Sequence, residues 1–309
     1  EPLTRSIQMA RPIYSIYANN NPDYWQVPGD KGNPIHLSEI DNVGYSNRDR
    51  RVFNGAISFN WQIPWLQGLS AKAMLAYDYN NTNNKNWYKE YYEYLYDSSK
   101  DAYNVAGSHT ISELTVKNEN YFKPTQQYSL NYNNDFGNHD ISALLLWELY
   151  NDRTEWVEAY RQFSVSAIDQ INAGDKMNIN NGGNSEVSAH QGLVGRFNYA
   201  YASKYLAELS FRYDGSYKFA PKKRWGFFPA ISLGWRLSEE SFFKERFEEI
   251  ENLKLRGSYG KIGDEGDFAA YQYLTGYTYP SGNYVLGGGG LSNGAKDKGM
   301  PNLNLTWYE

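Results

Sequence analysis

Ionisable residues with the spacing of a catalytic or metal-binding site are rare in this chain. The adjacent carboxylates Glu239 and Glu240 fall in a predicted turn that implies no pocket, so they are poor candidates for general acid–base chemistry. The acidic cluster at 264–267 lacks the spacing of a calcium-binding loop. The 4 histidines stand far apart, and there is no cysteine. We therefore expect no catalytic residue, no metal site and no cofactor, and a protein that is not an enzyme.

Aromatic side chains crowded into one segment are better suited to binding. They are Trp87, Tyr88, Tyr91, Tyr92, Tyr94 and Tyr96. Exposed aromatic patches mark binding surfaces, and aromatic residues are common where proteins meet. Three interpretations remain open for this set: contact with a partner protein, packing within the segment itself, and direct contact with a substrate.

A second set of chemically active residues is charged and lies on predicted strands. Between 205 and 214, Tyr205, Leu209 and Phe211 alternate with Glu208 and Arg212. Successive side chains of a strand point to opposite sides, so one face is apolar and the other is polar. The predicted strands 225–238 and 252–262 repeat this pattern. The charged residues expected on the polar face are Glu208, Arg212, Arg236, Lys254 and Arg256. They could form ion pairs within the protein or contact a substrate.

Strands of this kind indicate a transmembrane β-barrel. Their apolar face ends in Tyr, Trp and Phe, their polar face carries full charges, and they are about ten residues long, as in barrels with lipid outside and water inside. Eight such strands are predicted, at 51–61, 70–80, 125–133, 139–150, 191–201, 205–216, 225–238 and 252–262. The expected fold is all-β, with antiparallel strands that form part of a large transmembrane barrel. If the polar face lines the lumen, the five charged residues face water there.

Composition restricts the alternatives. No stretch approaches the roughly 20 consecutive apolar residues that a membrane helix requires. The net charge of −5 and the absence of a Lys/Arg stripe argue against nucleic acid as a partner. Aromatic residues make up 17% of the 309 residues, with 29 tyrosines. We expect residues 1–309 to form one partial β-barrel domain. A soluble glycan-binding β domain and a passive porin or adhesin remain as alternatives.

The connections between the predicted strands alternate in length, which predicts an orientation. Long connections near 81–123, 151–190 and 263–301, with a shorter one at 217–224, are typical of extracellular loops. Short connections at 64–68, 135–138 and 202–204, with 239–251, are typical of periplasmic turns.

Five consecutive motifs in the second half of the chain carry a family resemblance. They read YDGS at 213–216, FAP at 219–221, RWGFFP at 224–229, SLGWRLSEE at 232–240 and LKLRGSYG at 253–260. This run resembles the late barrel of the SusC/RagA family of TonB-dependent outer-membrane transporters. We recognise neither a plug nor a TonB box of that family in 1–309, so the resemblance covers the middle-to-late barrel of a fold with about 22 strands.

The resemblance implies a function and a set of partners. It implies TonB-dependent import of a bulky nutrient, with an oligosaccharide expected first and a peptide as the other substrate class. It also implies a SusD-like surface lipoprotein, the TonB complex acting through a plug, and outer-membrane lipid as partners, in a Gram-negative bacterium. Ion pairs that join the barrel wall to the plug are the structural role it implies for the five charged residues.

Two residues of these motifs carry local expectations. Gly215 is expected where a strand leaves the membrane, in a turn that uses positive φ. Pro229 lies inside a predicted strand, where it has no N–H to donate, so either a bulge or a missing hydrogen bond is expected.

Overall fold

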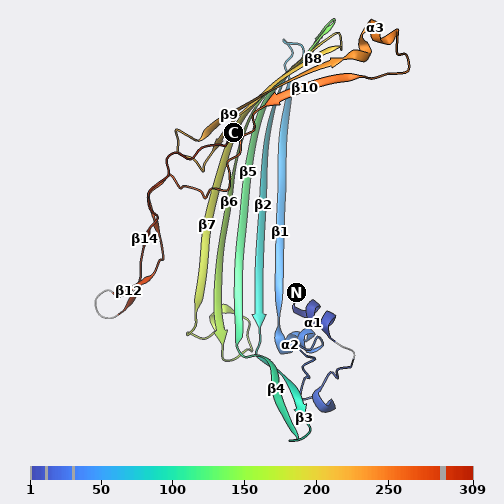
Figure 1. Cartoon of the computed structure of the whole chain (residues 1–309). Helices are drawn as coiled ribbons and strands as arrows, with labels where there is room; N and C mark the ends of the chain where they lie inside the picture. The colour runs from blue at the N-terminus through green and yellow to red at the C-terminus, as the bar shows by residue number, and fades with distance from the viewer. Residues whose placement is uncertain (1, 11–12, 30–31, 286–289, 309) are drawn as a thin grey trace. The chain divides into compact units, whose positions relative to one another are not determined.

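The predicted strands are present and belong to one sheet. The computed structural model describes residues 2–10, 13–29, 32–285 and 290–308. Its largest sheet has eight strands in the order β1-β2-β5-β6-β7-β8-β9-β10 (Figure 1). These strands are β1 (Gly44–Gln62), β2 (Leu69–Tyr88), β5 (Ser112–Phe136), β6 (His139–Phe163), β7 (Asn180–Tyr201), β8 (Tyr205–Ser216), β9 (Trp225–Arg236) and β10 (Lys254–Gly260). The pairs β7–β8, β8–β9 and β9–β10 are antiparallel, as expected.

Several strands are much longer than predicted. Strand β2 continues to Tyr88, β5 already begins at Ser112, β6 continues to Phe163, and β7 begins at Asn180. The long connections expected at 81–123 and 151–190 are therefore partly strand. Most side chains of these extensions are polar, and the few apolar ones, such as Leu114 and Val116, are too few to give a sustained alternation that would distinguish the extensions from loops.

A ring of asparagine amides helps to explain how such polar strands pair. Asn83 donates to Asn81, Asn81 donates to Asn120, and Asn120 donates to Asn118, each over 2.8 Å. Asn118 closes the ring by donating to Asn83. The four residues come from the neighbouring strands β2 and β5, so cross-strand amide bonds replace the apolar contacts that stabilise the rest of the sheet.

Contacts divide the chain into two compact units. The first contains Glu1–Phe53, Tyr79–Phe122 and Arg153–Glu186. The second contains Asn54–Asp78, Lys123–Asp152 and Val187–Glu309. Each is described by itself.

In the first unit, a separate hairpin packs on the N-terminal segment. The hairpin consists of β3 (Tyr91–Asp97) and β4 (Ala102–His109), and the segment contains α1 (Pro2–Met9), η1 (Ala18–Asn20), η2 (His36–Ser38) and α2 (Ile40–Val43). Buried Glu93 joins the two parts: its carboxylate accepts the Asn33 backbone N–H at 2.8 Å and lies 3.1 Å from Nδ1 of His36. Asn33 in turn donates its side-chain amide to the carbonyls of Ile16 and Gln26.

The first unit also has a small apolar core. Trp87, Leu114 and Phe163 are buried together, and Ile171 from η3 (Ile171–Ala173) packs against them. The connection after β6 is held over this core by Asp169, whose carboxylate lies 2.6 Å from Nζ of Lys85.

The second unit contains β8, β9 and β10 and the segments that follow them. After β9 come η4 (Leu237–Glu239) and α3 (Ser241–Lys244), and Figure 1 shows α3 in the connection between β9 and β10. After β10, two small two-stranded sheets form, β11 (Tyr277–Thr278) with β14 (Lys296–Asp297), and β12 (Asn283–Val285) with β13 (Leu291–Asn293). The expected 263–301 connection thus contains short strands, and its residues 286–289 lie outside the described residues.

The structure corrects the expectation for Gly215 and leaves one of the two alternatives expected for Pro229. Gly215 lies inside β8 opposite Trp225, and a Cβ at this position would be 3.0 Å from the Trp225 ring, so glycine is needed for ring packing rather than for a turn. Pro229 pairs with Phe211 in an unbroken register, so there is no bulge. Of the two alternatives at Pro229, only a missing ladder hydrogen bond remains, because proline has no N–H.

No helix among the described residues is both long enough and apolar enough to cross a membrane.

Candidate functional site

The strands of the second unit separate two chemically different faces. Along β8 and β9, large apolar side chains remain exposed on one face: Leu209 is 52%, Phe227 52% and Leu233 57% exposed. The register places such side chains opposite one another, for example Leu209 opposite Ile231 and Tyr213 opposite Phe227. A continuous exposed apolar face of this kind needs an apolar environment. The alternate residues, including Glu208 and Arg212, lie on the other face.

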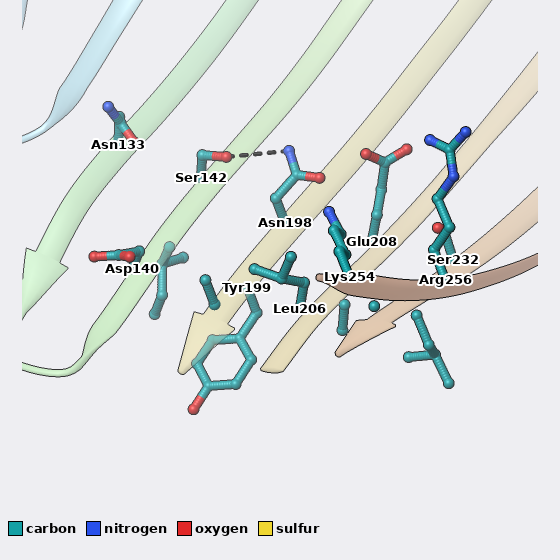
Figure 2. A pocket seen from close by; sticks show the side chains of 15 residues that line it. Asn133, Asp140, Ser142, Asn198, Tyr199, Leu206, Glu208, Ser232, Lys254 and Arg256 are labelled. Carbon is teal, nitrogen blue, oxygen red and sulfur yellow. Dashed lines mark hydrogen bonds between the residues drawn. The ribbon is translucent and has the colours of Figure 1, made fainter. Parts of the chain in front are cut away.

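A pocket of about 480 Å³ lies on the polar face. The residues that line it come from strands β5 to β10 of the sheet. Figure 2 shows its charged and amide side chains: Asn133, Asp140, Asn198, Glu208, Lys254 and Arg256. Asn198 donates to Ser142 over 3.1 Å, which links β7 to β6. The pocket therefore offers carboxylates, amides and cations side by side, a surface suited to polar solutes or to charged groups of another protein segment.

The five charged residues predicted for this face do not act as one group. Glu208, Lys254 and Arg256 line the pocket, whereas Arg212 pairs with Asp214 on its own strand at 2.8 Å. Arg236 stands opposite Lys254 in the register. Glu208 also forms an ion pair with Arg196 on β7, with 4.0 Å between Nε of Arg196 and the carboxylate.

Three of these cations form no close ion pair among the described residues, although a hydrogen bond from Lys244 and the charge of Arg236 both help to lower the pKa of Glu239. Within the described parts of the chain, no carboxylate lies within 4.0 Å of the charged atoms of Arg236, Lys254 or Arg256. Like charges opposite each other on neighbouring strands are destabilising. The Arg236–Lys254 pair is therefore a position where a negatively charged group would stabilise the sheet.

The aromatic set is divided by the structure. Trp87 is only 3% exposed and stacks edge-on against Phe163 with ring centroids 4.7 Å apart, which favours packing within the protein over contact with a partner or a substrate. Trp87 is buried by the apolar cluster that contains Leu114 and Phe163. The residues next to Trp87 in the sequence do not indicate this burial.

The tyrosines of the set lie at the end of β2 and along β3. Tyr91 stacks on His109, and Tyr94 packs edge-on against Tyr24 with ring centroids 5.0 Å apart. Tyr92 and Tyr96 donate their hydroxyls to Glu90 and Asp101, respectively. Packing with neighbouring residues accounts for most of these contacts, while Tyr88 is 41% exposed.

Sequence reasoning missed a hydrogen-bonded aromatic group at the end of β9. Glu240, which we set aside as a catalytic candidate, accepts hydrogen bonds from the Tyr205 hydroxyl at 2.7 Å and the Trp235 indole at 3.1 Å. Lys204 lies 3.0 Å from the same carboxylate. The hydrogen bonds from Tyr205, Trp235 and Lys204 lower the pKa of Glu240 to about 2. The group anchors two aromatic residues of the apolar face to the chain beyond the strand.

No group of three or more acidic or histidine side chains within the described ranges could hold a metal ion. The acidic residues at 264–267 are used differently: Glu265 binds Ser216, Lys218 and His190, and Asp264 accepts the Gly266 N–H.

Comparison with known proteins places the chain in a family. The family described as TonB dependent receptor-like, beta-barrel matches residues 8–307, and the chain belongs to it. The expected relationship to the SusC/RagA transporters and the antiparallel barrel fold are thereby confirmed.

Individual relatives agree with this family. A TonB-dependent receptor of Formosa agariphila is 32% identical over 261 residues, which is 82% of this chain and 23% of that protein. The TonB-dependent receptor SusC of Bacteroides thetaiotaomicron is 36% identical over 115 residues, or 37% of this chain and 11% of SusC. The RagAB peptide importer in its closed-closed state is similar in fold, with a TM-score of 0.69 at 17% identity over 92% of this chain and 30% of that chain. The chain thus spans about a quarter of the length of the first of these relatives.

Proposed function

We propose that the protein containing this chain is an outer-membrane transporter that imports a bulky nutrient, with an oligosaccharide as the first candidate substrate. The observation that carries this proposal is the pairing of an exposed apolar face with a polar face that holds a pocket. In a barrel, the first face suits lipid and the second suits a water-filled lumen. The family membership supports active import rather than catalysis or passive diffusion.

The partners of this proposed transporter follow from its relatives. TonB would supply energy through a plug, and a SusD-like lipoprotein would capture the substrate at the surface. The solved RagAB structures are named as those of a peptide importer, so peptides are the second candidate substrate class. The non-strand parts of 81–123, 151–190 and 263–301 are proposed to face outward together with the end of β2 and the β3–β4 hairpin, so that Tyr88 and the tyrosines of β3 would lie near such a partner. The unpaired Arg236, Lys254 and Arg256 would meet acidic groups of the plug or of the solute.

Gentle detergent extraction from the native outer membrane tests this proposal. The protein is captured by a tag, and the proteins bound to it in stoichiometric amount are identified. A surface lipoprotein of the SusD type supports the importer. Recovery of the protein alone, without such a lipoprotein and without a TonB-contacting plug in its own sequence, would favour a porin or adhesin. Recovery in the aqueous extract without detergent would favour a soluble glycan-binding domain.

Substrate class needs a separate measurement. Cells that lack the gene are compared with wild-type cells for growth on oligosaccharides and on peptides as the limiting nutrient. Loss of growth on oligosaccharides alone supports the first candidate, and loss on peptides alone supports the second.

A further inference from the structure

A second, smaller pocket lies on the polar face of the second unit. Its volume is about 140 Å³, enough for a few water molecules of about 30 Å³ each or for one small functional group. The side chains that determine its chemistry are Glu148, Tyr150, His190, Arg212, Asp214 and Trp307. We call it the wall pocket. Gly192 keeps it open, because a Cβ at this position would lie 2.5 Å from Oδ1 of Asp214.

His190 contributes a buried nitrogen that has no partner. Its Nε2 lies 3.1 Å from Glu265, and its ring stacks on Tyr150 with centroids 5.0 Å apart. Its Nδ1 is buried and has no hydrogen-bond partner among the described residues. A buried nitrogen without a partner is costly, so a ligand that supplies one is stabilised here.

The state of Glu265 determines what His190 offers to a ligand. Burial raises the pKa of Glu265, but hydrogen bonds from Ser216, Lys218 and His190 outweigh this effect and hold the pKa below its usual value. Glu265 is therefore ionised at neutral pH and takes the hydrogen of His190 Nε2. In the neutral ring, Nδ1 is then a hydrogen-bond acceptor.

The charges around the wall pocket also favour a donor. Asp214 and Arg212 satisfy each other through two bonds of 2.8 and 3.0 Å. Glu148 has one oxygen bound by Gln127, and no hydrogen bond to its other oxygen is found within the described chain. Two carboxylates and one guanidinium leave a formal excess of one negative charge. The best complement is a small cation with several N–H donors.

We propose that the wall pocket binds the primary ammonium group of a transported solute. Of the three donors of an ammonium group, Nδ1 of His190 and the second oxygen of Glu148 can accept two, and the ring of Trp307 forms a wall beside them. This ligand chemistry occurs in amino sugars and at the N-terminus or lysine side chains of peptides. The inference rests on the proposed function, because the pocket lies on the transport route only if the polar face lines the lumen.

Binding of matched probes to the purified full-length protein in detergent tests the proposal. Glucosamine is compared with N-acetylglucosamine, and glycylglycine with N-acetylglycylglycine, by saturation-transfer NMR. We expect the free amines to bind about tenfold more tightly than their acetylated forms, because acetylation removes the charge and two donors. Discrimination in both pairs supports the shared ammonium chemistry, and discrimination in one pair supports it and identifies the source.

Variants connect the binding to the pocket. Glu148→Gln keeps the size of the side chain and is expected to weaken binding of the amines about tenfold. Gly192→Ala, which fills the pocket, is expected to abolish it. Glu248→Gln, at an exposed position outside both pockets, is the matched control and is expected to change nothing.

Three outcomes overturn the proposal: equal binding of free and acetylated probes, unchanged binding in Glu148→Gln, and absence of binding of any probe. A lower unfolding temperature of Glu148→Gln together with absence of binding would mean that a cationic side chain of the protein itself fills the pocket. None of these outcomes bears on the importer proposal, which depends on co-purification and growth.

Discussion

Trp235 donates its indole N–H to the carboxylate of Glu240 over 3.1 Å, which ties a side chain of the apolar face to the chain beyond β9. Tyr205, opposite Trp235 in the register, donates to the same oxygen of Glu240. Aromatic rings with a polar atom at one edge suit the boundary between lipid and water. A carboxylate at this place holds both rings in orientation and completes their hydrogen bonds.

Replacement of Glu240 by glutamine is expected to reduce the dependence of stability on pH. The pKa of Glu240 is lowered from 4.5 to about 2, so its carboxylate stabilises the folded protein above pH 4.5. This contribution is lost as the pH falls from 4.5 through 2. Between pH 7 and pH 2, the unfolding temperature in detergent should fall less in Glu240→Gln than in the wild type. Glu248→Gln, at an exposed position of the same connection, is the control, and equal slopes for all three proteins would contradict the role of Glu240.

Loss of the Glu93 carboxylate is expected to detach the β3–β4 hairpin from the N-terminal segment. Glu93 is fully buried and accepts bonds from Asn33 and His36, so Glu93→Ala leaves buried donors without a partner at about 1–3 kcal/mol each. Limited proteolysis at the turn between β3 and β4 should become faster. Glu90→Ala removes an exposed carboxylate of the same segment and should leave the rate unchanged. Equal rates for the two variants would show that the carboxylate does not hold the hairpin.

Adding a methyl group at Gly195 is expected to destabilise the apolar face. A Cβ at this position would lie 2.1 Å from Cε1 of Phe211, so the ring must move at a cost of about 1–3 kcal/mol. Gly257, with open space around its Cβ position, provides a control in the same sheet. The free energy of unfolding in detergent should be lower for Gly195→Ala and unchanged for Gly257→Ala. The double variant Gly195→Ala with Phe211→Leu should recover part of the lost stability. A loss of the same size at Gly257 would indicate a backbone effect instead.

The strands and their two faces could be predicted from the sequence because apolar and polar side chains alternate along them with a period of two. Leu209, Phe211 and Tyr213 fall on the expected face for this reason. The ends of β2, β5, β6 and β7 could not be predicted, because residues such as Asn81 and Asn120 are polar and follow no such period. Their pairing depends on amide bonds between strands that are distant in sequence.

The candidate site could be predicted only in part for a related reason. Alternation places Glu208 and Arg256 on one face but does not reveal that Arg212 turns to Asp214. The packing of Trp87 could not be chosen from the sequence because it depends on Phe163, which is distant along the chain. The wall pocket requires Trp307 beside His190, a proximity that no local pattern encodes.

The proposed orientation can be checked by labelling whole cells, because the chain contains no cysteine. Single cysteines are placed at Ser292, in the connection proposed to be extracellular, and at Ser203, in a proposed periplasmic turn. A membrane-impermeant maleimide should label Ser292→Cys and leave Ser203→Cys unlabelled until the outer membrane is opened. The opposite pattern would mean that the chain crosses the membrane in the other direction.

The central claim, that one face of the sheet meets lipid and the other meets water, is tested most directly by a spin-label scan along β8. Nitroxides are attached one at a time to cysteines at positions 208 to 213 of the protein in lipid vesicles. Collision with oxygen, which concentrates in lipid, is compared with collision with a water-soluble nickel complex. The account predicts high oxygen accessibility at 209, 211 and 213 and high nickel accessibility at 208, 210 and 212. A scan without a period of two, or with the two sets of positions exchanged, would contradict it.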